Sequence, residues 1–406
     1  MGNNSDNKYS ASSQYLGYTY QSRFALYYLL GLSEDTSLFI EKEDDVVFIN
    51  EHKLSLGSMK HKRDGDVLTN LSNDFWKSVN VWLYAYEKNG RISSSLLFIL
   101  FTTSSVASSS FLNNFLIPDT NTNDLSILSA IESALSETIS KIVLPIKEKY
   151  NQLKPAEKKD FLSRIRIADK TPRIENLRSK VIDKYFRAIK REVRDDVYDH
   201  FIGWWEEQVL GILTKTRKTP ISCGEAFDKI SSIGSEYDYD NLPINFSTRE
   251  LSNEEYRASE QMQFVKQLKE IDVPTNTVTK AITDYYRAYE QRSLWARKQL
   301  WIDGEILAYE NKLVDEWERV KDAFTRGLKN DVSEKELKDI GFKIFQWAEF
   351  EANTLRIREK VTENYVRRGH FHLLANEKPL PRVYWHPFFL KRLESIFKGM
   401  ENGTME

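Results

Sequence analysis

The chain has 406 residues, and its 58 lysine and arginine residues nearly balance its 60 aspartate and glutamate residues, for a formal net charge of −2. A protein that coats DNA along its whole surface is much more basic, so a nucleic-acid substrate would need a local positive groove. The hydrophobic fraction of 41% excludes a disordered chain, and no stretch reaches the roughly 18 uninterrupted apolar residues of a membrane span.

The first residues and the cysteine content indicate the cellular compartment. Residues 1–13 are polar and lack the basic start and the apolar segment of a secretory signal. Cys223 is the only cysteine, which excludes a disulfide or a thiolate zinc cluster within one chain. We therefore expect a cytoplasmic, reducing compartment and no membrane partner.

The N-terminal part mixes two hydrophobic periodicities. Residues 15–30 carry apolar and aromatic side chains at spacings of three and four, which predicts a helix with one buried face. Residues 37–40 and 46–49 are short apolar runs that predict strands. A turn is predicted at residues 50–53, and the side chains of residues 54–60 alternate between two faces, as in a strand.

Two further elements complete this pattern. Residues 71–86 predict a helix with Ser72 as its N-cap, and residues 96–101 predict a strand buried on both faces. The expected order is helix, three strands, helix, strand. Residues 117–123 concentrate turn-forming residues, and the pattern after them is helical, as in residues 306–324.

The sequence therefore predicts two domains of different class. An α/β domain over residues 1–118 would hold a mixed sheet flanked by helices. A mostly α-helical domain would occupy residues 124–406. A chain of this length exceeds the size at which a single core stops growing, which agrees with two domains.

Acidic residues and a lysine flank the predicted hairpin. Asp44 and Asp45 come directly before one strand, with Glu41 close by, and Lys60 ends the next strand. Antiparallel pairing would bring the start of one strand beside the end of the other, so either aspartate can lie near Lys60. Carboxylates hold Mg²⁺ together with phosphate oxygens, and a nearby lysine stabilises developing charge, which is the chemistry of phosphodiester hydrolysis. Adjacent strand residues point opposite ways, which leaves open which aspartate faces a metal.

This arrangement resembles the PD-(D/E)xK nuclease superfamily, in which an acidic residue opens a hairpin and a D/E/Q-x-K triplet closes it. The resemblance is closer to the DNA endonuclease domain that CBASS and Lamassu effectors share. Three segments carry it, in the same order: GYTYQSRFALYYLL (17–30), IEKEDDV (40–46) and MKHKRDGDVLTNLSNDFWKSVNVW (59–82). They resemble the family's Gly-x-x-Tyr-Gln helix, its acidic strand start, and its Lys-His stretch with a Trp-Lys helix.

The resemblance implies roles for particular residues. Asp44, Asp45 and Glu41 would be metal ligands for Mg²⁺, with Mn²⁺ as an alternative ion, and Lys60 would be the catalytic lysine. Gln21 would be a further active-site residue. Ser58 stands where the family has glutamine or an acid, two residues before the lysine, and serine is a much poorer direct metal ligand.

The C-terminal half carries a second resemblance. Segments 200–209, 293–320 and 365–390 resemble the C-terminal domain of ABC three-component defence proteins, including Lamassu nuclease subunits, with a Trp-Ala-Arg helix, an Arg-Gly-x-x-His-x-Leu-Ala turn and a Trp-His-Pro. The resemblance implies a bacterial anti-phage complex with an SMC-like ATPase and a small helical accessory subunit.

Two other interpretations of this half remain open. His370, His372 and His386 could together bind Zn²⁺, although no cysteine or acid stands at ligand spacing and structural histidines are the simpler explanation. Aromatic residues interleaved with arginines could stack on bases, but packing in a core or at a protein interface is the more common use. This aromatic set is Tyr285, Tyr286, Tyr289, Trp295 and Trp301.

The expected function is Mg²⁺-dependent cleavage of double-stranded DNA with little sequence preference, since nothing here resembles a base-reading module. The nuclease would be held inactive in the complex and activated by release and self-association into a homo-oligomer. The alternatives are a catalytically weak or inactive nuclease fold kept as a scaffold, which Ser58 favours, and a CBASS effector with a C-terminal cyclic-nucleotide sensor of mixed α/β structure.

Overall fold

The computed structural model describes residues 11–51, 53–118, 120, 126–328 and 331–392. The chain divides into two compact units, Met1–Gly234 and Ser235–Glu406. Within the described residues, no helix is long and apolar enough to cross a membrane.

The N-terminal unit is built on a six-stranded mixed sheet in the order β7-β5-β3-β2-β1-β8. Strands β1, β2 and β3 form an antiparallel meander, β8 extends it beside β1, and β5 and β7 run parallel to β3. The strands are β1 (Ser37–Ile40), β2 (Val46–Asn50), β3 (Lys53–Lys60), β5 (Leu96–Thr102), β7 (Ile165–Ala168) and β8 (Ile221–Ser222). A separate parallel pair is formed by β4 (Val67–Leu68) and β6 (Ser105–Val106).

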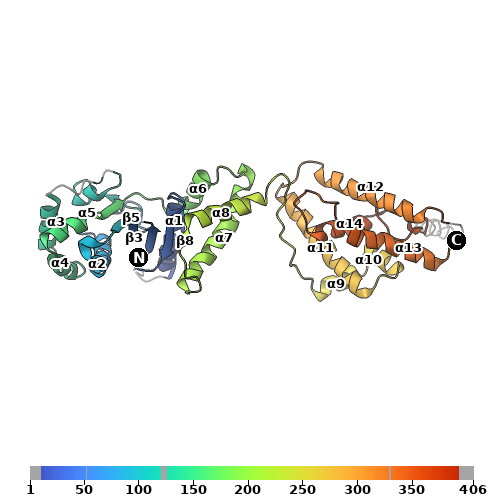
Figure 1. Cartoon of the computed structure of the whole chain (residues 1–406), viewed down its shortest axis with the longest axis horizontal. Helices are drawn as coiled ribbons and strands as arrows, with labels where there is room; N and C mark the ends of the chain where they lie inside the picture. Colours follow the sequence, from blue (N-terminus) through green and yellow to red (C-terminus); the bar gives the residue numbers. More distant parts are fainter. Residues whose placement is uncertain (1–10, 52, 119, 121–125, 329–330, 393–406) are drawn as a thin grey trace, which may run out of the picture. The chain divides into compact units, whose positions relative to one another are not determined.

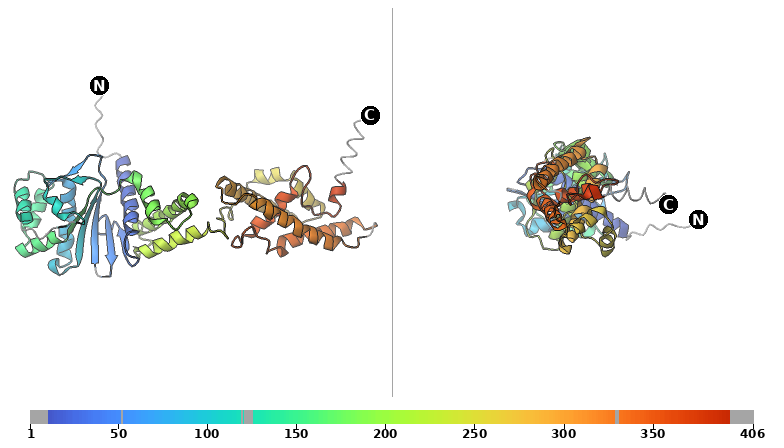
Figure 2. Two further views of the ribbon diagram at one scale, coloured as in Figure 1. Left: turned by 90° about the horizontal axis from the view of Figure 1, so that it is seen from above. Right: turned by 90° about the vertical axis from the view of Figure 1, so that its right-hand side faces the viewer.

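Helices cover both faces of this sheet (Figures 1 and 2). On one face lie α1 (Ala11–Leu29), α6 (Ile174–Tyr185), α7 (Arg194–Leu213) and α8 (Cys223–Ser235). On the other lie α2 (Asn73–Lys88), α3 (Ser126–Ser136), α4 (Leu144–Asn151) and α5 (Pro155–Ser163). Short helical turns complete the unit: η1 (Arg91–Ser93), η2 (Phe111–Phe115) and η3 (Arg191–Val193).

Alternating side chains of β5 pack into the two layers. The ring of Phe101 lies 5.2 Å from that of Phe24 on α1, whereas Phe98 stacks at 5.5 Å on Trp82 of α2. All four side chains are almost completely buried, which explains why β5 is apolar from Leu96 to Phe101. The sheet is therefore held in a fixed position between two hydrophobic cores.

The expected order of helix, three strands, helix and strand is confirmed, with boundaries that differ by a few residues. Ser72 is the N-cap residue of α2, although its side chain makes no capping hydrogen bond. The mixed sheet flanked by helices and the helical C-terminal region are confirmed at this level.

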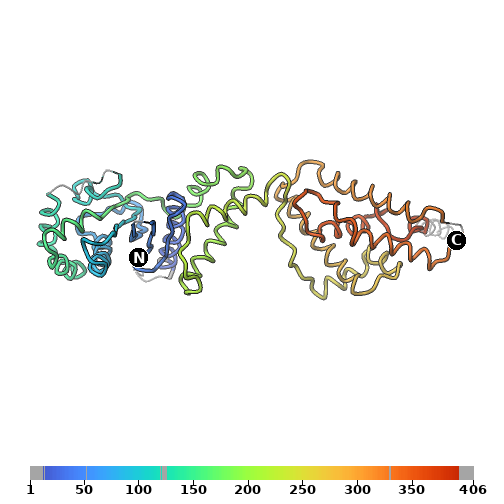
Figure 3. The backbone as a smooth tube through the Cα atoms, in the orientation of Figure 1, coloured from blue at the N-terminus to red at the C-terminus, as the bar shows by residue number. Residues whose placement is uncertain are grey.

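The division between the units lies later than the expected boundary at residues 118–124. After β5 the chain forms α3, α4 and α5 and then returns to the sheet as β7, and β8 is added on the opposite edge (Figure 3). Because both edge strands come from beyond residue 124, the segment expected to begin the helical domain completes the N-terminal unit.

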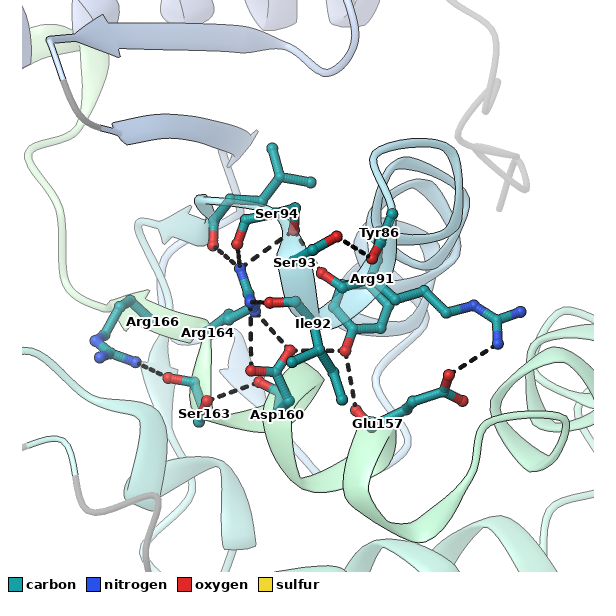
Figure 4. Close-up of polar contacts among 12 residues, drawn as sticks. Tyr86, Arg91, Ile92, Ser93, Ser94, Glu157, Asp160, Ser163, Arg164 and Arg166 are labelled. Carbon is teal, nitrogen blue, oxygen red and sulfur yellow. Dashed lines mark hydrogen bonds and ion pairs between the residues drawn. The ribbon is translucent and has the colours of Figure 1, made fainter.

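A polar network around Arg164 fixes this returning segment (Figure 4). The guanidinium donates hydrogen bonds to the carbonyls of Ile92, Ser94 and Leu96, at 3.0, 2.7 and 3.0 Å, and also pairs with Asp160. The hydroxyl of Tyr86 donates to Asp160 at 2.6 Å. Partly buried, charge-assisted contacts of this kind tie α5 and β7 to α2 and the start of β5.

Among the residues that the structure describes, the regular secondary structure of the C-terminal unit is helical. It contains α9 (Asn253–Ser259), α10 (Gln263–Glu270), α11 (Thr275–Arg297), α12 (Glu305–Thr325), α13 (Glu334–Gln346), a π-helical turn η4 (Trp347–Glu351) and α14 (Asn364–Ala375). The periodic pattern of residues 306–324 is confirmed as α12.

Helices α11 and α14 pack unusually closely at Gly369. A Cβ atom at this position would lie 2.2 Å from the carbonyl oxygen of Asp284 and 2.4 Å from Cβ of Ala288, both on α11. Only glycine allows the two backbones to approach this far.

The prediction of a turn at the Arg-Gly-x-x-His-x-Leu-Ala motif was wrong, because residues 368–375 form the C-terminal part of α14. Their apolar and histidine side chains are buried on several sides of the helix, so the periodicity of a one-sided helix is absent. Two residues of the aromatic set support the packing interpretation: Trp295 is fully buried, and the ring of Tyr285 stacks on that of Phe264 at 4.8 Å. Tyr289 does not, because it is half exposed.

Candidate active site at one edge of the sheet

The candidate site lies where β1 ends, β2 begins and β3 ends. A turn of residues 41–45 joins β1 to β2, and a hydrogen bond of 3.0 Å from the backbone N–H of Glu41 to the carbonyl of Asp45 closes it. Antiparallel pairing places Val46 opposite Gly57, and β3 then continues to Lys60. Asp45, one residue before β2, therefore lies beside the end of β3, as the hairpin predicts.

Asp45 and Lys60 are in direct contact. Oδ2 of Asp45 accepts hydrogen bonds from Nζ of Lys60 at 3.2 Å and from the backbone N–H of Met59 at 2.6 Å. The side chains of Asp45 and Lys60 are 19% and 24% exposed, so both remain accessible while partly shielded from water. Oδ1 of Asp45 accepts no hydrogen bond from the residues that the structure describes, which leaves this oxygen for another ligand.

Asp44 has different partners from its neighbour. Its Oδ2 accepts a hydrogen bond of 2.8 Å from the indole Nε1 of Trp82, and its Oδ1 accepts one of 2.9 Å from the backbone N–H of Asp45. Burial, and then the nearby Asp45 carboxylate, raise the pKa of Asp44 from 3.8 to about 6. Two acids are thus held close together with only part of their negative charge compensated.

Ser58 lies at the centre of the site but is almost completely buried, at 2% exposure. Its hydroxyl accepts a hydrogen bond of 2.7 Å from Ser78 on α2 and lies 3.5 Å from Oδ2 of Asp45. The side chain therefore joins α2 to the hairpin and touches the acid only weakly.

Glu41 and Gln21 are less closely connected to this group. Glu41 has a backbone φ of 56°, in the left-handed region, and its side chain is exposed. Burial and the charge of Asp45 raise the pKa of the Glu41 carboxyl, and the charge of Lys60 opposes the shift, so this acid lies within electrostatic range of the pair. Gln21 lies on α1. In the described structure it makes no hydrogen bond to the central group of the site, which is Asp44, Asp45, Ser58 and Lys60, so its role stays a prediction.

Three groups of the site were not expected from the sequence: the indole of Trp82, the hydroxyl of Ser78 and the backbone N–H of Met59. The helical pattern of residues 71–86 predicts that Trp82 is buried, and a buried indole N–H needs an acceptor. That the acceptor is Asp44 depends on packing between segments 38 residues apart in the chain.

The three C-terminal histidines have separate partners. Nδ1 of His370 lies 2.6 Å from the carbonyl of Val366, Nε2 of His372 lies 3.4 Å from Glu349, and Nε2 of His386 lies 3.5 Å from Glu334. Burial lowers the pKa of His370 to about 4, which keeps it neutral. No cluster of three or more potential ligands occurs among the described residues, and Nε2 of each histidine is buried without a hydrogen bond there, so neither zinc binding nor full hydrogen bonding of these rings is borne out.

Comparisons with known proteins identify one part of the chain. Residues 264–393 match the family described as C-terminal domain 7 of the ABC-three component (ABC-3C) systems. The matched segment lies within the C-terminal unit and supports a defence-system subunit. No curated protein matches the sequence.

A similar solved structure is that of the Moraxella osloensis Cap4 SAVED/CARF-domain containing receptor. It is 14% identical, with 68% of each chain covered and a TM-score of 0.32. A likeness this weak carries no argument about the site.

Proposed function

We propose that the protein is a metal-dependent endonuclease that cleaves double-stranded DNA with little sequence preference in anti-phage defence. The observation that carries the proposal is the contact of 3.2 Å between Nζ of Lys60 and Oδ2 of Asp45, with the second acid, Asp44, adjacent. A lysine paired with an acid beside another acid is the group set that phosphodiester hydrolysis needs.

The order of the strands supports this proposal. A helix, a three-stranded meander, a second helix and a strand parallel to the third form the centre of the N-terminal unit. The acids stand at the start of the second strand and the lysine at the end of the third, where the PD-(D/E)xK superfamily has them. The sequence resemblance and the arrangement of the site both support the proposal.

The donors present suit a Mg²⁺ or Mn²⁺ ion. Asp44 and Asp45 supply carboxylate oxygens and Glu41 is within electrostatic range; burial and then the charge of Asp45 raise the pKa of Asp44, and a divalent cation would compensate that charge. When bound, such an ion supplies charge stabilisation for the phosphate and lowers the pKa of a coordinated water. Lys60 is held by Asp45 in a position to donate to a phosphate oxygen or to orient a water.

The protein's wider role follows from the ABC-three component match. We propose that an SMC-like ATPase and a small helical accessory subunit hold the nuclease inactive, and that its release and self-association activate it. Measurement of particle size with and without the ATPase subunit and DNA ends tests this step. A monomer of unchanged size that cuts fully would contradict it.

The nuclease proposal is tested by incubating the purified full-length protein with plasmid DNA and Mg²⁺. We expect cleavage, its loss in EDTA, and a loss of at least about a hundredfold in Lys60→Ala. Lys53→Ala is the matched control, because Lys53 is an exposed lysine at the other end of the same strand. Equal cleavage by Lys60→Ala and the unaltered protein, once free of inhibitory partners, would contradict the proposal.

A second candidate function is a scaffold that retains a nuclease fold without cutting. The burial of Ser58 and its hydrogen bond with Ser78 favour it, because this residue offers no carboxylate where the superfamily has an acid or glutamine. Absence of cleavage by the isolated protein in both Mg²⁺ and Mn²⁺ is the result expected of a scaffold. A CBASS effector is less well supported, since the described part of the C-terminal unit is helical, whereas the expected cyclic-nucleotide sensor is mixed α/β.

A further inference from the structure

A groove of about 570 Å³ opens beside the turn that carries the acids. Its lining comes from two segments of the N-terminal unit: residues 39–42, at the end of β1 and in the following turn, and residues 212–218, at the end of α7 and in the following loop. Pairing of Leu38 with Ile221 fixes the strand that follows the second segment against β1, so the two walls are held together by the sheet.

The wall formed by residues 212–218 is built around Arg217. Its guanidinium donates to Gln208 at 2.6 Å, to Glu225 at 2.6 and 2.8 Å, and to the carbonyls of Thr219 and Pro220 at 3.0 and 2.9 Å. Its backbone N–H donates to the carbonyl of Gly211 at 2.8 Å. Arg217 is therefore occupied in fixing the loop, which leaves the other cations of the groove free.

Three lysines supply the positive charge of the groove: Lys42, Lys215 and Lys218. All three are exposed, and none has an acidic partner among the described residues. Lys42 lies over the ring of Phe39, with Nζ 4.2 Å from the ring centre. The one acid in the lining is Glu41, which interacts electrostatically with Asp45 and Lys60.

Each wall also contains a non-glycine residue in the left-handed backbone region. These are Glu41, with φ of 56°, and Lys215, with φ of 61°. Such conformations cost free energy and persist where surrounding contacts hold them; here the backbone N–H of Lys215 donates to the carbonyl of Ile212 at 3.1 Å, and that of Glu41 donates to the carbonyl of Asp45 at 3.0 Å. The loop is thus a fixed structure that presents Lys215 and Lys218.

We propose that this groove binds backbone phosphates of the DNA strand next to the phosphodiester held at Asp45 and Lys60, an inference that rests on the proposed nuclease function. Unpaired lysines suit phosphate oxygens, and the apolar side chains of Ile212 and Leu213 suit the sugars between them. No base-reading geometry is needed, because contacts to phosphate position a duplex without selecting its sequence. Glu41 lines the groove and also interacts electrostatically with Asp45 and Lys60, so the groove lies beside the proposed reaction site.

The test is the salt dependence of duplex binding in EDTA, where no cleavage occurs. Fluorescence anisotropy with the full-length protein and a short labelled duplex should give a line of log K against log salt. In Lys215→Ala/Lys218→Ala we expect affinity to fall by about tenfold or more and the slope to decrease by about 2, since each lysine–phosphate contact contributes roughly 0.9. Lys215→Arg/Lys218→Arg should restore both values.

Lys141→Ala/Lys159→Ala is the matched control. Both residues are exposed lysines of the same unit, without an ion pair in the described structure, on the α3–α5 side of the sheet. An unchanged slope in the groove variant, an equal decrease in the control, or no duplex binding by the unaltered protein at low salt would each overturn the inference. Because binding is measured without metal, a protein that binds through these lysines but does not cut in Mg²⁺ overturns the nuclease function alone.

Discussion

The indole Nε1 of Trp82 on α2 donates a hydrogen bond of 2.8 Å to Oδ2 of Asp44, which connects the hydrophobic core directly to the acidic turn. This bond stabilises the ionised carboxylate, whereas burial and the charge of Asp45 oppose ionisation. The hydrogen bond from Trp82 therefore limits the rise in the pKa of Asp44 that burial and Asp45 cause.

Replacement of this tryptophan should change the pH response of the site. Trp82→Phe keeps an aromatic ring against Phe98 but removes the donor, so the pKa of Asp44 should rise further, and stability should fall by about 1–3 kcal/mol. Trp76→Phe is the control, because Trp76 is equally buried but donates to the carbonyl of Asn70. The pH profile of Mg²⁺ binding should move to higher pH in Trp82→Phe only; identical profiles in both variants would contradict the role of this bond.

Binding of Mg²⁺ should release a proton in mildly acidic solution. The folded-state pKa of Asp44, about 6, is raised above its ordinary value of 3.8, so between these pH values the folded protein holds a proton that the unfolded chain lacks. Stability contributed by this proton is present below about pH 4 and is lost as pH rises through 6. A cation must displace the proton, so the apparent Mg²⁺ affinity should rise by up to about tenfold per pH unit between pH 4 and 6 and then level off.

Calorimetric titration in buffers of different ionisation enthalpy measures this release. We expect close to one proton per ion at pH 5, nearly none at pH 8, and none at either pH in Asp44→Asn. Proton release that persists in Asp44→Asn would assign the effect to another group.

Replacement of Ser58 by alanine should affect stability more than cleavage. Ser78 keeps its hydrogen bond of 3.0 Å to the carbonyl of Asp74, so the free energy of unfolding should fall by only about 1 kcal/mol. Cleavage should stay within about threefold of the unaltered protein, as in the control Ser55→Ala on the same strand. A loss of a hundredfold in Ser58→Ala alone would show that this hydroxyl takes part in the chemistry.

The close approach of α11 and α14 predicts a strong effect at Gly369. Gly369→Ala would place a methyl group 2.2 Å from a carbonyl oxygen of Asp284, and separation of the helices should cost roughly 3 kcal/mol in the C-terminal unit. Gly203→Ala is the control, because this position on α7 has no atom within 4 Å, and alanine should stabilise the helix by about 1 kcal/mol. If Gly369→Ala unfolds at the same temperature as the unaltered protein, this result would contradict the packing described.

The sequence predicted the elements that depend on local patterns. The helix–three-strand–helix–strand order and the proximity of Asp45 to Lys60 follow from periodicity and from a short turn, which act over a few residues. The Trp82–Asp44 bond and the position of Ser58 depend on how α2 packs on the hairpin, which no local pattern specifies. Strand β7 had a visible signal in the alternation of Ile165, Arg166 and Ile167, whereas β8, with two residues, had almost none.

The two edge strands also determine how the N-terminal unit can be isolated. A fragment ending at residue 118 would lack β7 and β8 and would leave the backbone N–H and C=O groups along the outer sides of β5 and β1 unpaired. Unpaired ladders of this kind recruit strands from other molecules and cause aggregation. A fragment ending near Gly234 keeps both ladders covered, so proteolysis or gene truncation in the 118–124 segment would yield an insoluble product instead of a separately folded N-terminal unit.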